Sequence, residues 1–147
     1  RISPIPPEPI DIWIGATADV AIERAAKLGD GWLGDPGSLF DATRHQLSVY
    51  REACEKSGTG EGAVALRRDV FVGQSVADAN RRMAPYLGNY RGFDPEALIV
   101  GDIALVAERL NDYKELGFTD VLIRNISRDQ DEALATIERM GRVKEQL

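Results

Sequence analysis

Three small residues, Gly15, Ala16 and Thr17, separate a short apolar run from a segment with the periodicity of a helix. A turn of this kind at the carboxyl end of a parallel strand presents free backbone N–H groups and the positive end of the helix dipole to an anion. Thr17 adds a hydroxyl. The turn therefore predicts a phosphate-binding site, and the structural alternative is that Thr17 only caps the helix while Gly15 only tightens the turn.

Two further positions could contribute to such a site. Trp32 ends the next apolar run, where it could line a flat aromatic cofactor or fill the core, and the residue type leaves both interpretations open. Arg124 and Asn125 end the last apolar run, which is where many barrels bind phosphate. Trp32 and Arg124 therefore join the turn as candidate cofactor-binding residues.

Charged residues interrupt the longest apolar run at Arg67, Arg68 and Asp69. Unpaired charges are costly in a strand that is buried on both faces. Strand alternation places Arg67 and Asp69 on one face and Arg68 on the other. We interpret the three as paired structural ions, and the alternative is an arginine directed toward a cofactor.

The chain has one histidine, His45, and one cysteine, Cys54. His45 lies inside a predicted helix and is expected to face solvent; it could act as a base only if that helix faced the active-site mouth. Cys54 is expected to pack in the core. This inventory, with no clustered carboxylates, indicates neither a metal site nor a nucleophile triad, so no catalytic side chain is assigned.

The composition is typical of a soluble globular protein. Of the 147 residues, 44% are hydrophobic and 29% are charged, and no stretch is apolar enough to cross a bilayer, so no membrane partner is expected. The formal net charge is −6, with the basic residues dispersed, which argues against nucleic acid as a partner. A single cysteine forms no internal disulfide, and a reducing cytoplasm is the expected location.

The elements that must position these residues alternate along the chain. Apolar runs predict strands at residues 10–14, 31–33, 63–72 and 119–125, and periodicity with capping signals predicts helices at about 18–28, 39–57, 75–86, 103–116 and 129–143. Alternating strands and helices indicate an α/β fold with a parallel sheet, either open as in flavodoxin-like proteins or closed into a barrel. Residues 1–147 are treated as one unit, with the proline-rich residues 1–9 as a linker into the first strand.

Several segments, in their order and spacing, resemble the bacterial luciferase-like monooxygenase family. Pro9–Thr17 looks like that family's strand five, and Arg24–Leu33, with its Leu-Gly-Asp-Gly-Trp motif, looks like the end of helix five and strand six. Asp69–Val72 resembles strand seven, Leu98–Asp102 the start of the next helix, and Leu116–Arg124 strand eight.

The resemblance implies that the chain is the C-terminal half, strands five to eight, of a (β/α)₈ TIM barrel. It also implies a flavin- or F420-dependent oxidoreductase or monooxygenase that acts on a small-molecule substrate, with FMN as the cofactor and coenzyme F420 as the alternative. Gly15, Ala16 and Thr17 would then hold the cofactor phosphate. Ala16 stands where the family has a second glycine, which bears on how closely a phosphate approaches this backbone.

Two hypotheses from other classes remain beside this one. A non-catalytic half-barrel could bind a phosphate-bearing ligand or self-associate, because its unpaired strand edges and uncovered interior favour a homo-oligomer or pairing with an upstream half. A different phosphate-binding barrel enzyme could share only the layout, since fold alone does not define function.

Overall fold

The computed structural model describes residues 6–147 of the chain. The predicted linker over residues 1–9 therefore lies partly outside the described residues. Residues 6–12 form neither helix nor strand and are exposed. None of the helices within residues 6–147 is long and apolar enough to cross a membrane.

The described elements alternate between strand and helix along most of the chain. The strands are β1 (Trp13–Gly15), β2 (Gly31–Gly34), β3 (Ala63–Val72), β4 (Ile99–Gly101) and β5 (Asp120–Asn125). The helices are α1 (Asp19–Leu28), α2 (Phe40–Ser57), α3 (Val76–Leu87), α4 (Ile103–Leu116) and α5 (Gln130–Lys144), with a 3₁₀ turn at Pro95–Ala97.

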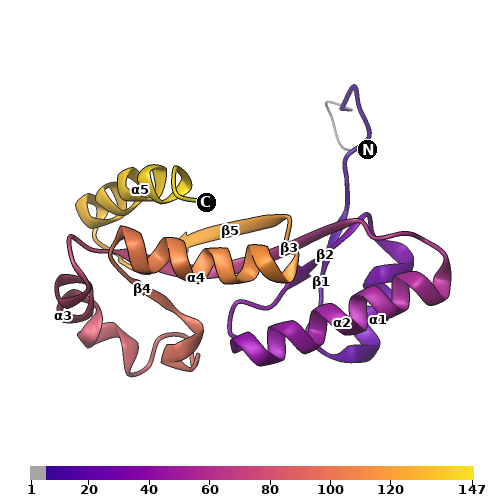
Figure 1. Ribbon diagram of the computed structural model, residues 1–147, viewed down its shortest axis with the longest axis horizontal. Helices are drawn as coiled ribbons and strands as arrows, with labels where there is room; N and C mark the ends of the chain where they lie inside the picture. The colour runs from indigo at the N-terminus through magenta and orange to yellow at the C-terminus, as the bar shows by residue number, and fades with distance from the viewer. Residues whose placement is uncertain (1–5) are drawn as a thin grey trace.

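Strand β3 is the centre of a sheet in which every pair is parallel. The start of β3 pairs with β2, which in turn pairs with β1, and the end of β3 pairs with β4. Strand β5 pairs with β3 from Ala65 to Val70, so it shares residues with both β2 and β4 and lies on the opposite edge. In Figure 1, β3 crosses the molecule, with α1 and α2 toward one end and α3 at the other.

The structure corrects two boundaries predicted from the sequence. The sheet has five strands, because Ile99–Gly101, expected as the start of a helix, pairs with the end of β3 and forms β4. The first strand is Trp13–Gly15 rather than residues 10–14. Ile12 lies outside it because its backbone N–H donates to Asp30 Oδ2 at 2.8 Å and its carbonyl accepts from Asp30 N at 2.9 Å.

Local hydrogen bonds explain where most helices begin. The side chains of Ser75, Asp102 and Asp129 accept from the backbone N–H three residues later and cap α3, α4 and α5. The capping signals that predicted helices from about residues 75 and 129 are thereby confirmed. Helix α1 differs, since its N-cap is Ala18 and no side chain caps it; the alternative in which Thr17 caps this helix is wrong.

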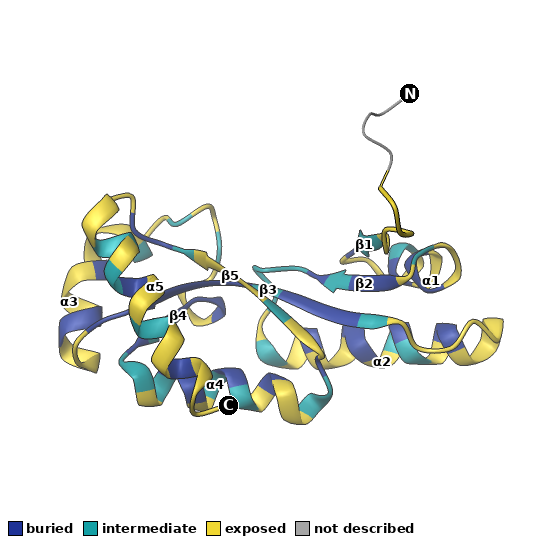
Figure 2. Cartoon of the chain, turned by 90° about the horizontal axis from the view of Figure 1, so that it is seen from above, coloured by how far each residue is buried: buried dark blue, intermediate teal, exposed yellow. Residues whose placement is uncertain are grey.

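The main core lies between the sheet and helices α1, α2, α4 and α5. Trp32 is at its centre, fully buried, with its ring stacked on Tyr50 at a centroid distance of 5.6 Å. Cys54 is buried in the same core, as predicted. A second cluster of buried residues, Phe71, Ala79, Met83, Leu98 and Ile126, joins α3 to the end of β3. In Figure 2, β3 is mostly buried, whereas much of β5 is exposed.

The face of the sheet opposite the main core is called here the second face. Residues paired in a parallel sheet lie on the same face, so Leu33, Arg67, Asp69 and Arg124 share it. Trp13 also lies there, because a Cβ added to Gly31 would be 2.9 Å from its ring. This face carries charged and aromatic side chains where the main core carries mostly apolar ones.

Candidate functional site

The carboxyl ends of parallel strands meet at one edge of a sheet, and the turn after β1 lies at this edge. Three hydrogen bonds hold the turn in place. Ala16 N donates to Leu33 O at 3.3 Å, Trp32 Nε1 donates to Ala16 O at 2.9 Å, and Gln46 Nε2 donates to Thr17 O at 3.2 Å. The neighbouring strand and helix α2 therefore fix the backbone of the turn.

The same turn leaves hydrogen-bond donors free. The backbone N–H groups of residues 17–20 have no partner among the described residues, and no side chain caps α1. Thr17 and Gly15 are exposed. A Cβ added to Gly15 would find its nearest atom, Leu33 O, at 4.0 Å, and Gly15 has no positive φ. Neither packing nor backbone conformation therefore requires glycine here, and the space beside it is open.

Asp19 and His45 lie at the start of α1 and in α2, next to this turn. His45 Nε2 is 3.6 Å from Asp19 Oδ2, and their side chains are 63% and 58% exposed. The prediction that His45 faces solvent is confirmed. An exposed pair of this kind contributes little to stability.

Of the two interpretations left open for Trp32, the structure places it in the core. Its exposed fraction is zero, its indole N–H is already bonded to Ala16 O, and its ring contacts Tyr50 and Phe118. Its effect on the turn is indirect, through the hydrogen bond that holds the Ala16 carbonyl.

Arg68 is fully buried on the helix-covered face of β3 and makes six hydrogen bonds. The closest acceptors are Asp35 O and Thr43 Oγ1, both at 2.8 Å, and its guanidinium lies 4.7 Å from the centre of the Tyr113 ring. Burial lowers the pKa of Arg68, and Tyr113 partly offsets that effect. All of these partners are neutral groups, so the expected ion pair is wrong for Arg68.

Arg67 and Asp69, on the second face, do form the predicted ion pair, with Arg67 Nε 3.3 Å from Asp69 Oδ1. Asp69 is fully buried, and its other oxygen accepts from Tyr90 Oη at 2.9 Å. Burial raises the pKa of Tyr90, and the Asp69 carboxylate raises it further. Tyr90 therefore stays neutral and is held in one position above the carboxyl end of β3.

A cavity of about 360 Å³ lies beside Tyr90, at the carboxyl end of β5. Its walls come from the end of α3, the loop that follows, and the connection from β5 to α5; Arg124 lies in it with Arg91 and Arg128. Arg124, predicted to contribute to a cofactor site, therefore lines a cavity in the structure. At the turn after β1, by comparison, Gly15 and Thr17 are exposed and Ala16 is buried.

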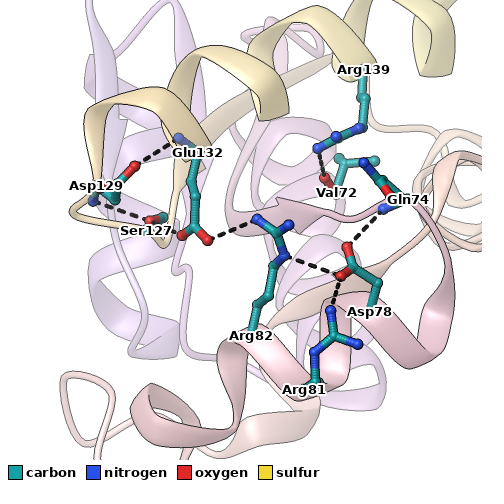
Figure 3. Close-up of polar contacts among 9 residues, drawn as sticks. All are labelled: Val72, Gln74, Asp78, Arg81, Arg82, Ser127, Asp129, Glu132 and Arg139. Carbon is teal, nitrogen blue, oxygen red and sulfur yellow. Dashed lines mark hydrogen bonds and ion pairs between the residues drawn. The ribbon is translucent and has the colours of Figure 1, made fainter.

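Beside this cavity, an ionic network joins α3 to the start of α5 and to the connection that precedes it (Figure 3). Arg82, on α3, donates to Asp78 Oδ1 at 3.1 Å and to Glu132 Oε1, on α5, at 2.9 Å. Glu132 also accepts from Ser127 Oγ at 2.7 Å, in the connection that carries Arg128. The Gln74 N–H and Arg82 lower the pKa of Asp78, so its carboxylate stays ionised at neutral pH. The network therefore fixes the wall formed by α3 relative to the β5–α5 connection.

The turn and the Arg124 cavity lie at the same edge of the sheet but at separate positions along it. β2 and β3 lie between β1 and β5, and three interstrand spacings amount to about 14 Å. The sequence did not single out Tyr90, Arg91 or Arg128, because they lie in loops without periodicity. The available signal was the clustering of tyrosine, asparagine and arginine at residues 86–91.

Residues 1–97 match the sequence model of a family described as luciferase-like monooxygenase. No curated protein sequence matches the chain.

Solved structures resemble nearly the whole chain at low sequence identity. The structure of apo-MsnO8 has 19% identity and a TM-score of 0.77, over 99% of this chain and 54% of the other. An F420-dependent secondary alcohol dehydrogenase in complex with an F420–acetone adduct has 13% identity and a TM-score of 0.69, over 90% of this chain and 48% of the other. The oxygenating constituent of 3,6-diketocamphane monooxygenase of Pseudomonas putida, in complex with FMN, has 17% identity and a TM-score of 0.63, over 92% and 48%.

The chain therefore spans about half the length of these structures. The parallel sheet and its helices match the expected fold, with β1, β2, β3 and β5 in the positions of four consecutive strands of a (β/α)₈ barrel. The predicted half-barrel fold is confirmed. At these identities the likeness shows the fold alone, and the site must be argued from this chain's own residues.

Proposed function

Because the chain belongs to the luciferase-like monooxygenase family, we propose that it works as part of a flavin- or F420-dependent oxidoreductase that acts on a small molecule. FMN is the proposed cofactor and coenzyme F420 the alternative. One similar structure is a complex with FMN and another is that of an F420-dependent enzyme, so both cofactors occur with this fold.

The observation that carries the proposal is the turn Gly15–Thr17. It combines unpartnered backbone N–H groups at an uncapped helix start with open space beside Gly15. A phosphate placed there would accept those N–H bonds and lie at the positive end of the α1 dipole. The N–H of Ala16 is already bonded to Leu33 O, and its methyl group is buried, so the alanine that replaces the family's second glycine does not fill the space beside the free N–H groups.

The flavin, when bound, supplies hydride or oxygen chemistry, and the protein supplies binding and orientation. In this proposal the turn holds the phosphate, and Thr17 adds its exposed hydroxyl. Trp32 supports the turn from the core through its bond to Ala16 O. Arg124 faces the same edge of the sheet from β5, and about 14 Å of sheet separates it from the turn, so it would meet another part of the cofactor or the substrate.

A test separates the phosphate from the rest of the flavin. We expect the protein to bind FMN more tightly than riboflavin, measured by quenching of flavin fluorescence. Gly15→Val should abolish this preference, because its side chain fills the space beside the free N–H groups. The expected loss of FMN affinity is about tenfold or more, since hydrogen bonds to a charged group contribute about 1.5–3 kcal/mol.

Gly141→Val is the matched control. Gly141 also has open space around it, but it lies in α5, far along the chain from the turn. It should keep the preference for FMN. Equal binding of FMN and riboflavin by the unaltered protein, or equal losses in both variants, would contradict the phosphate site. The same titration with coenzyme F420 decides between the two cofactors.

A second candidate function is association without catalysis. It is favoured by exposed apolar side chains on β5 and α5: Leu122 at 40%, Ile123 at 37%, Leu134 at 57% and Ile137 at 64%. In the described residues, β5 pairs only with β3, which leaves its other edge free to pair. A homo-oligomer would cover this surface, and sedimentation equilibrium over a range of protein concentrations would detect it.

A further inference from the structure

The cavity at the carboxyl end of β5 contains an excess of positive charge. Three arginines line it, Arg91, Arg124 and Arg128, and no carboxylate is among its lining residues. Within residues 6–147, none of the three forms an ion pair or a hydrogen bond through its side chain. Elsewhere in this acidic chain, by contrast, Arg51 pairs with Glu61 and Arg82 with Asp78.

The polar groups of the cavity are fixed before any ligand arrives. Tyr90 is held by Asp69 at 2.9 Å. Asn125 donates through Nδ2 to Ser127 O at 3.0 Å, while its Oδ1 is buried and has no partner among the described residues. A buried amide oxygen without a donor costs free energy, so a water, or a hydroxyl or N–H group on the organic part of a ligand, is favoured beside it.

The backbone at the rim is strained. Arg91 has a φ of 55°, a conformation that costs a residue with a side chain roughly 1–2 kcal/mol. Strain of this kind persists only where the surrounding structure enforces it, and it concentrates at sites that bind ligands. Here it brings the Arg91 guanidinium to 5.5 Å from the centre of the Phe93 ring, next to the cavity.

We propose that this cavity binds a phosphate monoester, with Arg91, Arg124 and Arg128 as its cationic ligands. Guanidinium groups bind phosphate oxygens through paired N–H bonds, and the charge of three of them exceeds that of a dianion. The Arg82–Glu132 pair keeps the two walls of the cavity together. Because about 14 Å of sheet separates it from Gly15, one phosphate group cannot occupy both places, so this site is additional to the one proposed at the turn.

The test uses inorganic phosphate and phenyl phosphate, titrated into the protein by calorimetry at low ionic strength. Arg124→Gln, Arg128→Gln and Arg91→Gln should each weaken binding of both probes about tenfold or more. All three side chains are exposed, so the variants are expected to fold, and circular dichroism verifies this. Arg24→Gln is the matched control, since Arg24 is an exposed arginine on α1 outside the cavity; it should change binding by less than about twofold.

Absence of phosphate binding, or equal losses in Arg24→Gln and the cavity variants, would overturn the proposal. Titration of FMN into the cavity variants then identifies the source of the phosphate. Unchanged FMN affinity means that the subsite serves a phosphorylated substrate, and a loss that riboflavin does not show means that it serves the cofactor. A failure of the protein to bind FMN at all would contradict the proposed function without affecting this site.

Discussion

Arg67 and Arg68 are neighbours in β3, yet they lie on opposite faces of the sheet in different surroundings. Arg68 lies among the helices and makes six hydrogen bonds to neutral groups. Arg67, on the second face, meets only Asp69, and two of its buried nitrogens have no hydrogen-bond partner among the described residues. Farther along the same face, Arg124 has no partner within residues 6–147. The helix-covered face uses its arginine to hold elements together, whereas the second face keeps hydrogen-bonding capacity free.

The largest expected effect comes from removing Arg68, the buried arginine whose guanidinium is hydrogen-bonded on the helix-covered face. Arg68→Met should lower the free energy of unfolding by about 3–5 kcal/mol, because it leaves the carbonyls of Asp35 and Ser38 and the Tyr113 hydroxyl buried without their donor. Urea unfolding followed by circular dichroism measures the change.

Arg124→Gln provides the contrast on the second face. It removes an exposed side chain without a partner, so the free energy of unfolding should stay within about 0.5 kcal/mol of that of the unaltered protein. If Arg68→Met and Arg124→Gln lowered the free energy of unfolding by similar amounts, the two faces would not differ in whether their arginines stabilise the fold.

An intermediate effect is expected where the core supports the turn. Trp32→Phe keeps a ring against Tyr50 but removes the donor to Ala16 O. The free energy of unfolding should fall by about 1–3 kcal/mol, and amide hydrogen exchange at residues 16–18 should become faster. Exchange that is unchanged at these residues, in a destabilised protein, would show that Trp32 acts on the core alone.

The effect expected at the network beside the cavity depends on pH. The folded protein lowers the pKa of Asp78, through the Gln74 N–H first and then Arg82. Its stabilising contribution is therefore complete above the ordinary pKa of an aspartate, about 4, and is lost as the pH falls below that value toward the folded pKa. Asp78→Asn should destabilise the protein at pH 7 and flatten the loss of stability between about pH 5 and 2. A variant with the same acid unfolding curve as the unaltered protein would rule out this role.

Predictions from the sequence succeeded where the signal was local. Capping pairs such as Ser75 with Asp78 and the strand alternation at Arg67–Asp69 depend on neighbours within a few residues, and the structure contains both. The predicted end of the helix at residue 116 depends on its neighbour in the same way, because Gly117 follows it with a φ of 104°, which favours glycine.

The remaining features depend on contacts between distant segments. The sequence left open whether Trp32 fills the core or lines a cofactor. Its contact with Tyr50 of α2, which only the folded chain produces, places it in the core. Ile99–Gly101 is too short to show a period, and only the unused edge at the end of β3 makes it a strand. Tyr90 joins the site because it reaches Asp69, 21 residues earlier in the chain. No spacing in the sequence announces a contact of this kind.

The ten residues of β3 also determine how the sheet can misassemble. A shift of the strand by one residue would exchange its faces, bringing Arg67 and Asp69 into the helical layer and Arg68 out of it. An apolar strand would lose only part of its packing in such a shift. In β3, however, the N–H groups of Arg68 would lose their acceptors, and the Arg67–Asp69 ion pair would be buried among apolar helices. The alternation of charge in β3 thus selects one pairing with β2, β4 and β5 over its shifted competitors.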